Sequence, residues 1–254
     1  MITKDQLSLL SKKHKTNDST ILREYAQLYF LSRLYNFTQS QKIFFKGGTA
    51  IHLIYGSPRF SEDLDFTVEL SKTEFQKFIK TLFSAISNEV PVKFKERKTL
   101  TGKKFLLTWQ SKIVSYPIFI SLDFSFREKI IYKTKSIIKT DFPVLFYSYI
   151  YHPTKKELLA EKVRALLTRK AGRDLYDIWF LLSQKAEVDQ DLILQKLKYY
   201  QINKFKPGEI KKAAKQIGKD NFILDLKPFV SLPERKKLAS FYDYLIDSLE
   251  THLT

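Results

Sequence analysis

The chain has 254 residues, a formal net charge of +17 and no cysteine, which excludes disulfides and thiolate metal sites. Its four histidines are scattered without the spacing of metal ligands, which argues against a zinc centre. No apolar run approaches the roughly twenty residues of a membrane-spanning helix, and the first residues lack the pattern of a signal peptide. We therefore expect a soluble cytoplasmic protein that does not bind membranes.

The first two predicted elements are a helix and a strand. The helix covers about residues 19–35, is amphipathic and is capped by Asp18 or Ser19. Residues 42–45 form a short apolar run that is typical of a buried strand.

A glycine pair follows the strand in the stretch Lys46-Gly47-Gly48-Thr49. The glycines break the strand, and residues 49–55 have the apolar spacing of about two helical turns. A helix that starts after a glycine turn presents free amides to whatever lies over the turn, and these amides favour an anion such as phosphate. A glycine pair on its own is more often an ordinary tight turn.

The next predicted strand, residues 63–68, places Asp63 and Asp65 on one face by polar and apolar alternation. Two like charges on one strand face repel unless a cation or basic group compensates them. An Asp-x-Asp pair alone is common by chance. Its position one short helix after the glycine turn predicts a divalent metal beside a phosphate.

A third carboxylate is expected in a later strand. A helix over residues 72–88 is followed by strands near 92–97, 105–110 and 117–125, with a turn at 101–103 consistent with a hairpin. In the last strand Asp123 shares one face with Ser121 and Ser125, so Asp123 is the candidate ligand. The alternative is an exposed or turn-forming acid at a strand end.

From Thr154 onward the pattern is almost wholly helical, with a capping-box pattern at Thr154 and Glu157. Lys162 lies inside the apolar stripe of the first of these helices, so its ammonium group either reaches solvent or points toward a negative group. In the next helix, Asp174 is either a first-turn acid that complements the helix dipole or a functional group.

The excess positive charge is spread over the whole chain. Basic clusters would attract a polyanion and make its binding depend on salt; they comprise Lys93, Lys95, Arg97, Lys98, Lys103 and Lys104, and later Lys204, Lys206, Lys211, Lys212, Lys215 and Lys219. Solvated lysine-rich faces are the alternative explanation. Nucleic acid is the macromolecular substrate that this composition favours.

Four segments together resemble the AbiEii/AbiGii toxin family of nucleotidyltransferases, which belongs to the DNA polymerase β-like superfamily. They are Gly-Gly-Thr-Ala at 47–50, Arg-Phe-Ser-Glu-Asp-Leu-Asp-Phe at 59–66, Leu-Ala-Glu-Lys-Val-Arg-Ala at 159–165 and Arg-Asp-Leu-Tyr-Asp at 173–177. The resemblance implies an α+β nucleotidyltransferase fold, with a mixed β-sheet flanked by helices and a helical C-terminal domain. Residues 1–150 would form the catalytic domain and residues 151–254 a helical domain that completes the nucleotide site, with the active site in the cleft between them.

The resemblance also implies roles for individual residues. Asp63 and Asp65 would hold two Mg²⁺ ions, and Asp123 would bind one of them and activate the attacking hydroxyl. Asp174 would position Lys162 or the nucleotide, and Asp177 would be mainly structural. The nucleotide-binding residues would be Lys46, Gly47, Gly48, Thr49, Ser61, Lys162 and Arg173.

The predicted activity is Mg²⁺-dependent transfer of a nucleoside monophosphate from an NTP to an acceptor hydroxyl. By resemblance, the acceptor is RNA, such as the 3′ end of tRNA, and the protein is the toxin of a toxin–antitoxin or phage-defence system with an antitoxin partner. One alternative is a nucleotidyltransferase that modifies a small molecule or a protein. Another is a non-catalytic basic nucleic-acid-binding protein. Residues 185–254 carry no recognised motif.

Overall fold

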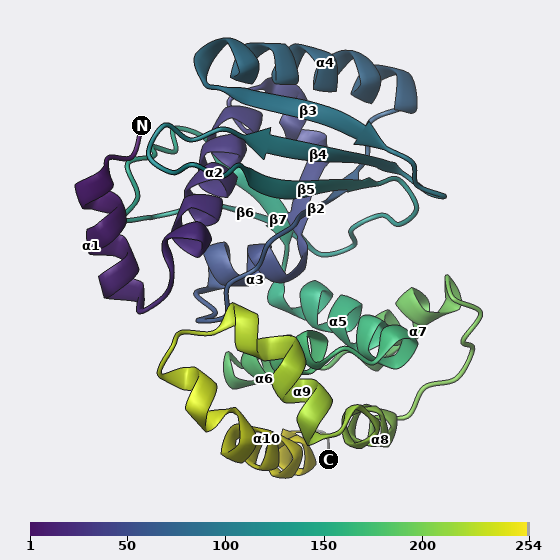
Figure 1. Ribbon diagram of the computed structural model, residues 1–254. Helices are drawn as coiled ribbons and strands as arrows, with labels where there is room; N and C mark the ends of the chain where they lie inside the picture. Colours follow the sequence, from purple (N-terminus) through teal and green to yellow (C-terminus); the bar gives the residue numbers. More distant parts are fainter. Residues whose placement is uncertain (253–254) are drawn as a thin grey trace. The chain divides into compact units, whose positions relative to one another are not determined.

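The computed structural model describes residues 1–252 and divides into two compact units. Unit 1 comprises residues 1–56 and 60–153, and unit 2 comprises residues 57–59 together with the chain from residue 154 onward. The strands of the described chain belong to unit 1, whereas unit 2 is helical (Figure 1). The fold is therefore a mixed α and β fold, as predicted.

Unit 1 contains two sheets and the first helices of the chain. In chain order its elements are α1 (Lys4–His14), α2 (Asp18–Leu34), a 3-10 turn (Thr38–Lys42), β1 (Ile43–Lys46), α3 (Gly47–Tyr55), β2 (Leu64–Val68), α4 (Lys72–Glu89), β3 (Val92–Arg97), β4 (Lys103–Trp109), β5 (Ile118–Ser125), β6 (Lys133–Ser136) and β7 (Ile150–Pro153). The strands and helices predicted in this region are confirmed to within two residues at their ends. Helix α1 and the β6–β7 pair were not predicted.

The larger sheet has the strand order β1-β2-β5-β4-β3. Strands β2 and β5 are parallel, and the other neighbouring pairs are antiparallel, so the sheet is mixed. The chain reaches β5 from β2 by way of α4, β3 and β4, since parallel neighbours need a long crossover connection. The second sheet is the antiparallel pair β6–β7.

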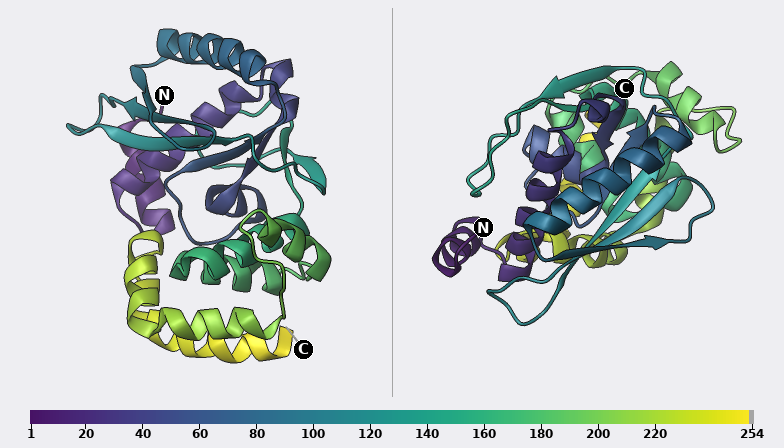
Figure 2. Two further views of the ribbon diagram at one scale, coloured as in Figure 1. Left: turned by 90° about the vertical axis from the view of Figure 1, so that its right-hand side faces the viewer. Right: turned by 90° about the horizontal axis from the view of Figure 1, so that it is seen from above.

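Side-chain alternation gives the larger sheet an apolar face and a second face. Helices α2 and α4 cover the apolar face (Figures 1 and 2). In this core Phe66 stacks on Phe124 with ring centroids 4.8 Å apart, and Phe75 of α4 lies 4.9 Å from Phe124. We call the second face the polar face; its residues include Lys46, Asp65, Lys93, Lys95, Arg97, Lys104, Leu106, Thr108, Phe119, Ser121 and Asp123.

Unit 2 is a group of packed helices. Its elements are α5 (Lys155–Arg169), α6 (Gly172–Ser183), α7 (Gln190–Lys198), α8 (Gly208–Ile217), α9 (Lys219–Leu226), two 3-10 turns (Lys227–Phe229 and Glu234–Lys237) and α10 (Leu238–His252). Helix α5 packs against α6, α7 and α8. Within residues 1–252, no helix combines the length and the apolar character that crossing a membrane requires.

The start of α5 differs in one detail from the predicted capping box. The Thr154 hydroxyl accepts a hydrogen bond from the amide of Glu157, as predicted. The Glu157 carboxylate pairs with buried Lys196 of α7 at 2.6 Å, and Lys196 also lies 3.7 Å from Glu161. The predicted capping glutamate therefore joins α5 to α7 through a buried ion pair.

Candidate active site

The glycine turn joins β1 to α3 directly. Helix α3 begins at Gly47, two residues earlier than predicted, and Lys46 is its extended N-cap. Gly47 has a φ of +79°, a conformation that residues with a side chain rarely adopt. The amides at the start of α3 carry a partial positive charge that favours an anion; nucleotide binding by Gly47, Gly48 and Thr49 stays a prediction.

Gly47 also lies against the first strand acid. A Cβ atom at this position would collide with Oδ2 of Asp65, so a side chain here would displace the carboxylate. The turn therefore requires glycine for both its backbone conformation and its close approach to Asp65. This contact is the physical link between the two motifs that the sequence places close together.

Asp65 and Asp123 are cross-strand partners. Lys46 pairs with Asp65, Asp65 pairs with Asp123 on the parallel strand β5, and Asp123 pairs with Lys104 on β4. The four residues form a row across the polar face, with one lysine at each end. The Nζ of Lys104 lies 3.8 Å from Oδ2 of Asp123, and both side chains are about two-fifths exposed. Lysines at both ends of the row compensate the two like charges.

Asp63 lies just before β2 and is exposed. Its backbone carbonyl accepts a hydrogen bond from the buried Thr49 hydroxyl, which joins the first turn of α3 to the segment that enters β2. The backbone carbonyl of Ser61 accepts a hydrogen bond of 3.0 Å from the side-chain amide of Gln27 on α2. These two bonds hold the segment that carries the acids.

The side chains of the row are suited to a magnesium ion. Two carboxylates on adjacent strands are hard oxygen ligands, and Mg²⁺ commonly uses one or two protein carboxylates together with substrate phosphates. Asp65 and Asp123 fit this requirement. Within the described chain, no group of three or more His, Cys, Asp or Glu side chains is arranged to hold a metal ion. The structure brings Asp65 and Asp123 together by strand register, and Asp63, the other predicted ligand, lies two residues before Asp65; its role at a metal stays a prediction.

Unit 2 contains a buried network of charged side chains around Lys162. The ammonium group lies 2.7 Å from Oδ2 of Asp177 and 3.1 Å from Oδ1 of Asp174, both on α6. Asp177 also accepts bidentate hydrogen bonds of 2.8 to 3.0 Å from the buried guanidinium of Arg59. Arg169, at the end of α5, binds Asp174 at 2.6 Å.

These contacts set the ionisation of the network. Burial disfavours the charged form of Lys162, but the nearby carboxylates of Asp177 and Asp174 outweigh burial and raise the pKa of the ammonium group. Burial likewise opposes ionisation of Asp174, but the attraction of Lys162 and Arg169 prevails and holds the pKa of this carboxyl well below its ordinary value. Lys162 and Asp174 are therefore both charged at neutral pH.

Sequence patterns located Lys162, Asp174 and Asp177 but did not reveal the role of Arg59. Of the two alternatives for Lys162, the second holds: its ammonium group is buried and points toward negative groups, the two acids of α6. Arg173, expected to reach a phosphate, places its guanidinium 4.7 Å from the ring centre of Phe229. The only sequence signal for Arg59 was its place at the start of the run at 59–66.

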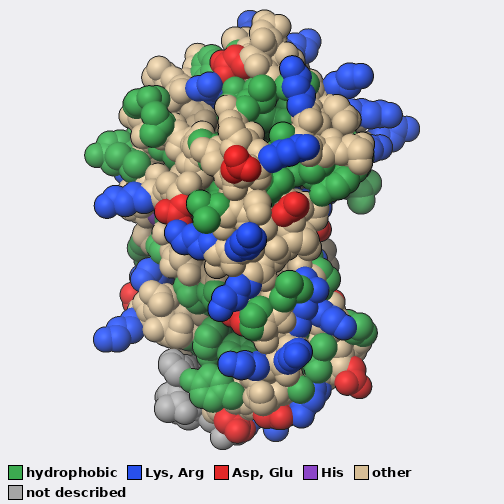
Figure 3. Space-filling model, turned by 60° about the vertical axis from the view of Figure 1, so that its left-hand side comes forward, with side chains coloured by type: hydrophobic (Ala, Val, Ile, Leu, Met, Phe, Trp, Pro, Cys, Tyr) green, Lys and Arg blue, Asp and Glu red, His purple; other side chains and the backbone are tan. Residues whose placement is uncertain are grey.

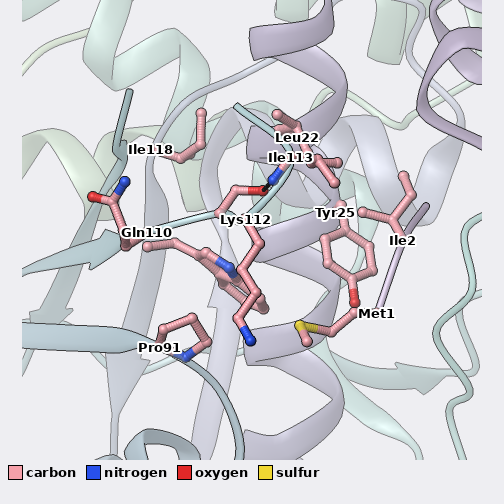
Figure 4. A pocket seen from close by; sticks show the side chains of 11 residues that line it. Met1, Ile2, Leu22, Tyr25, Pro91, Gln110, Lys112, Ile113 and Ile118 are labelled. Carbon is pink, nitrogen blue, oxygen red and sulfur yellow. Dashed lines mark hydrogen bonds between the residues drawn. The ribbon is translucent and has the colours of Figure 1, made fainter. Parts of the chain in front are cut away.

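The surface of the molecule carries an excess of basic side chains and an apolar pocket. Figure 3 shows Lys and Arg side chains over much of the face that it presents, with fewer Asp and Glu side chains among them. Unit 1 has a pocket of about 150 Å³, lined by apolar and aromatic side chains that include Leu22, Tyr25, Trp109 and Ile118. Figure 4 shows this pocket from close by. The residues that line it include no carboxylate, so this pocket is separate from the row of acids.

Comparison with known proteins gives a family and a fold. The family model described as nucleotidyl transferase AbiEii toxin, type IV toxin–antitoxin system, matches residues 29–244. No curated protein matches the chain in sequence.

Among solved structures, JHP933 from Helicobacter pylori matches with a TM-score of 0.57 and 18% identity, over 92% of this chain and 95% of that one. A putative nucleotidyltransferase from H. pylori matches with a TM-score of 0.57 and 19% identity, over 92% and 98% of the two chains. MenT4, a nucleotidyltransferase toxin from Mycobacterium tuberculosis, matches with a TM-score of 0.56 and 14% identity, over 100% and 94%. At these identities the likeness concerns the fold.

Proposed function

Because the chain belongs to the AbiEii family of nucleotidyl transferase toxins, we propose that it transfers a nucleoside monophosphate from an NTP to a hydroxyl of RNA, with Mg²⁺ held at Asp65 and Asp123. The finding that most supports this proposal is the row Lys46–Asp65–Asp123–Lys104, which begins at the glycine turn before α3. The row places two oxygen ligands for a metal next to helix amides that favour phosphate.

The proposed reaction is an in-line displacement at the α-phosphorus of the NTP. The acceptor oxygen forms a bond to this phosphorus, the bond from phosphorus to the bridging oxygen breaks, and pyrophosphate leaves. Asp123, whose carboxylate is accessible, takes the proton of the acceptor hydroxyl. The amides of Gly48 and Thr49 bind the triphosphate, and bound Mg²⁺ supplies positive charge for the phosphate oxygens.

RNA is proposed as the acceptor because of charge. The net charge of +17 creates a long-range attraction for a polyanion, whereas a small acceptor would gain little from it. The 3′ end of tRNA is the specific acceptor that we propose. An antitoxin that binds this chain is proposed from the family, as is action inside the cell.

The proposed role of unit 2 is to bind and position the nucleotide. Contacts of Lys162 and Arg173 with the triphosphate stay predictions, as does the role of residues 151–254 in completing the nucleotide site. The network around Lys162 supports a positioning role for Asp174, since this carboxylate holds the ammonium group at 3.1 Å. It supports a structural role for Asp177, which binds Arg59 and Lys162 together.

Transfer assays test the proposal. The purified protein is incubated with Mg²⁺, total tRNA and each of the four NTPs in turn, labelled at the α-phosphate. We expect label in RNA with the wild type and with Asp191→Asn, an exposed matched control on α7. Asp65→Asn should lower the rate at least about a hundredfold because a metal ligand is lost. Its melting temperature should stay close to that of the wild type.

Three results would contradict parts of the proposal. If none of the four nucleotides is transferred to RNA, the proposed acceptor is wrong, and parallel assays with protein and aminoglycoside acceptors test the alternative. Equal rates for Asp65→Asn and Asp191→Asn would refute the metal role of the row. Wild-type transfer that persists unchanged in EDTA would refute dependence on Mg²⁺.

A further inference from the structure

Strand β3 carries three cations on the polar face. Lys93, Lys95 and Arg97 occupy every second position, so their side chains leave the same face of the strand. All three residues are exposed. The alternating positions between them hold Val92, Phe94 and Glu96, which belong to the opposite face.

The register connects this basic strand to the acids. Arg97 pairs with Lys104, Lys104 pairs with Asp123, and Asp123 pairs with Asp65. Since neighbouring strands lie about 4.8 Å apart, β3 is roughly 10 Å from β5. The polar face is thus positive along β3 and negative at β5 and β2.

An exposed aromatic ring lies on the same face. Phe119 of β5 is 49% exposed, and its cross-strand neighbour is Thr108, which in turn pairs with Lys93. Ser121, two residues nearer to Asp123, faces Leu106 and then Lys95. A ring on the same sheet face as a line of cations is an arrangement by which sheet surfaces stack bases and bind phosphates.

Acidic side chains are kept away from this basic line. Glu96 belongs to the opposite face, where Lys103 pairs with it at 2.5 Å. The two acids of the row, Asp123 on β5 and Asp65 on β2, are two and three strands away from β3. A polyanion bound to this face therefore meets positive charge along β3, with the two carboxylates of the row on the same face beyond β4.

We propose that Lys93, Lys95, Arg97, Lys104 and Phe119 form an acceptor surface that binds the single-stranded 3′ end of the RNA substrate. This inference rests on the proposed function and adds the place where the acceptor binds. The phosphates of the RNA lie along β3, a base stacks on Phe119, and the terminal hydroxyl lies toward Asp123. A single strand fits because its unpaired bases are free to stack, whereas the bases of a duplex are not. An acidic polypeptide would satisfy the cations but would not require the exposed ring.

A binding assay without catalysis tests this surface. The probe is a short fluorescent single-stranded RNA with a free 3′ hydroxyl, titrated with the full chain in EDTA and without NTP. We expect the triple variant Lys93→Ala/Lys95→Ala/Arg97→Ala to bind at least about tenfold more weakly, and the slope of log K against log salt to fall in magnitude by about 2, since each phosphate contact contributes about 0.7. Phe119→Ala should lose about five- to a hundredfold in affinity.

A matched control separates this surface from general charge. The variant Lys72→Ala/Lys77→Ala/Lys80→Ala removes the same charge from exposed positions of α4, which covers the apolar face of the same sheet. It should keep near wild-type RNA affinity and salt slope. A blunt RNA duplex should bind the wild type more weakly than the single strand does.

The outcomes separate this inference from the proposed function. If the β3 and α4 variants bind RNA equally well, the acceptor surface is wrong, even where the wild type still transfers label to RNA. The acceptor surface is also wrong if the β3 variant loses only the binding of polyglutamate, an acidic polypeptide probe, and keeps its affinity for RNA. If the acceptor surface is correct but Asp65→Asn remains active in transfer, the metal role fails and the RNA surface stands.

Discussion

Asp177→Asn should destabilise unit 2 severely, because this carboxylate serves two buried cations. Its Oδ2 lies 2.8 Å from Nη2 of Arg59 and 2.7 Å from Nζ of Lys162. The side chains of Arg59 and Asp177 are 2% and 1% exposed, so solvent provides almost no screening. The substitution keeps the shape of the side chain but places a neutral amide against both cations.

The expected cost follows from breaking a buried pair on one side only. Such changes cost about 3–5 kcal/mol, since the remaining charge stays desolvated. For a chain of this size, each kcal/mol lowers the melting temperature by about 2–4 °C, so a fall of roughly 6–20 °C is expected. Replacing both partners, in Arg59→Met/Asp177→Leu, should recover part of the loss, because Lys162 keeps its contact with Asp174.

Urea denaturation followed by circular dichroism measures the free energy of unfolding of each variant. The matched control is Asp243→Asn, which breaks the exposed pair Lys219–Asp243 and should cost less than about 1 kcal/mol. If Asp177→Asn costs no more than this control, the buried network does not stabilise unit 2. If the double variant is less stable than the single one, the loss does not come from an unpaired buried charge.

Further predictions concern the glycine turn and ionisation. Gly47→Ala should lower the free energy of unfolding by more than about 1 kcal/mol and suppress transfer, because φ is +79° and the methyl group would displace Asp65. The control Gly208→Ala should have neither effect, because a methyl group there meets open space. Burial lowers the pKa of His152, so the unfolded state binds more protons and stability should fall as the pH drops below about 6.5; His152→Gln should flatten this dependence in thermal melts. Because the pKa of Asp174 is lowered, the stability of the protein should fall further below about pH 4. In urea denaturation the variant Asp174→Asn should not show this further fall.

The local patterns of unit 1 could be read from the sequence because they depend on near neighbours. Strand β3 has the predicted bounds of Val92–Arg97, and α4 starts at a capping box formed by Ser71 and Glu74. Alternation in β5 correctly put Ser121, Asp123 and Ser125 on one face. Each of these features requires only side-chain periodicity or a hydrogen bond to a residue three positions away.

The pairing of distant elements was not readable in the same way. Nothing in the composition of β2 and β5 specifies that they run parallel, or that Asp65 is opposite Asp123 rather than two residues displaced. Arg59 is separated from Asp177 by 118 positions, so its burial leaves no periodic signal. Lys196 is a basic residue on a helix, and only the approach of α7 to α5 turns it into the partner of Glu157.

Lysines at the two ends of the row compensate part of the negative charge of its two acids, which the sequence pattern of the acids did not reveal. Two carboxylates on neighbouring strands require positive charge, and the protein itself supplies part of it, from Lys46 on one side and Lys104 on the other. Lys104 is 41% exposed and 3.8 Å from Asp123, and so weak a surface pair costs little to separate. The sheet can therefore fold with its carboxylates already side by side, and the metal ion that we propose would separate Lys104 from Asp123 at little cost. Preorganisation of this kind is what a fixed strand register provides and what a flexible loop would not.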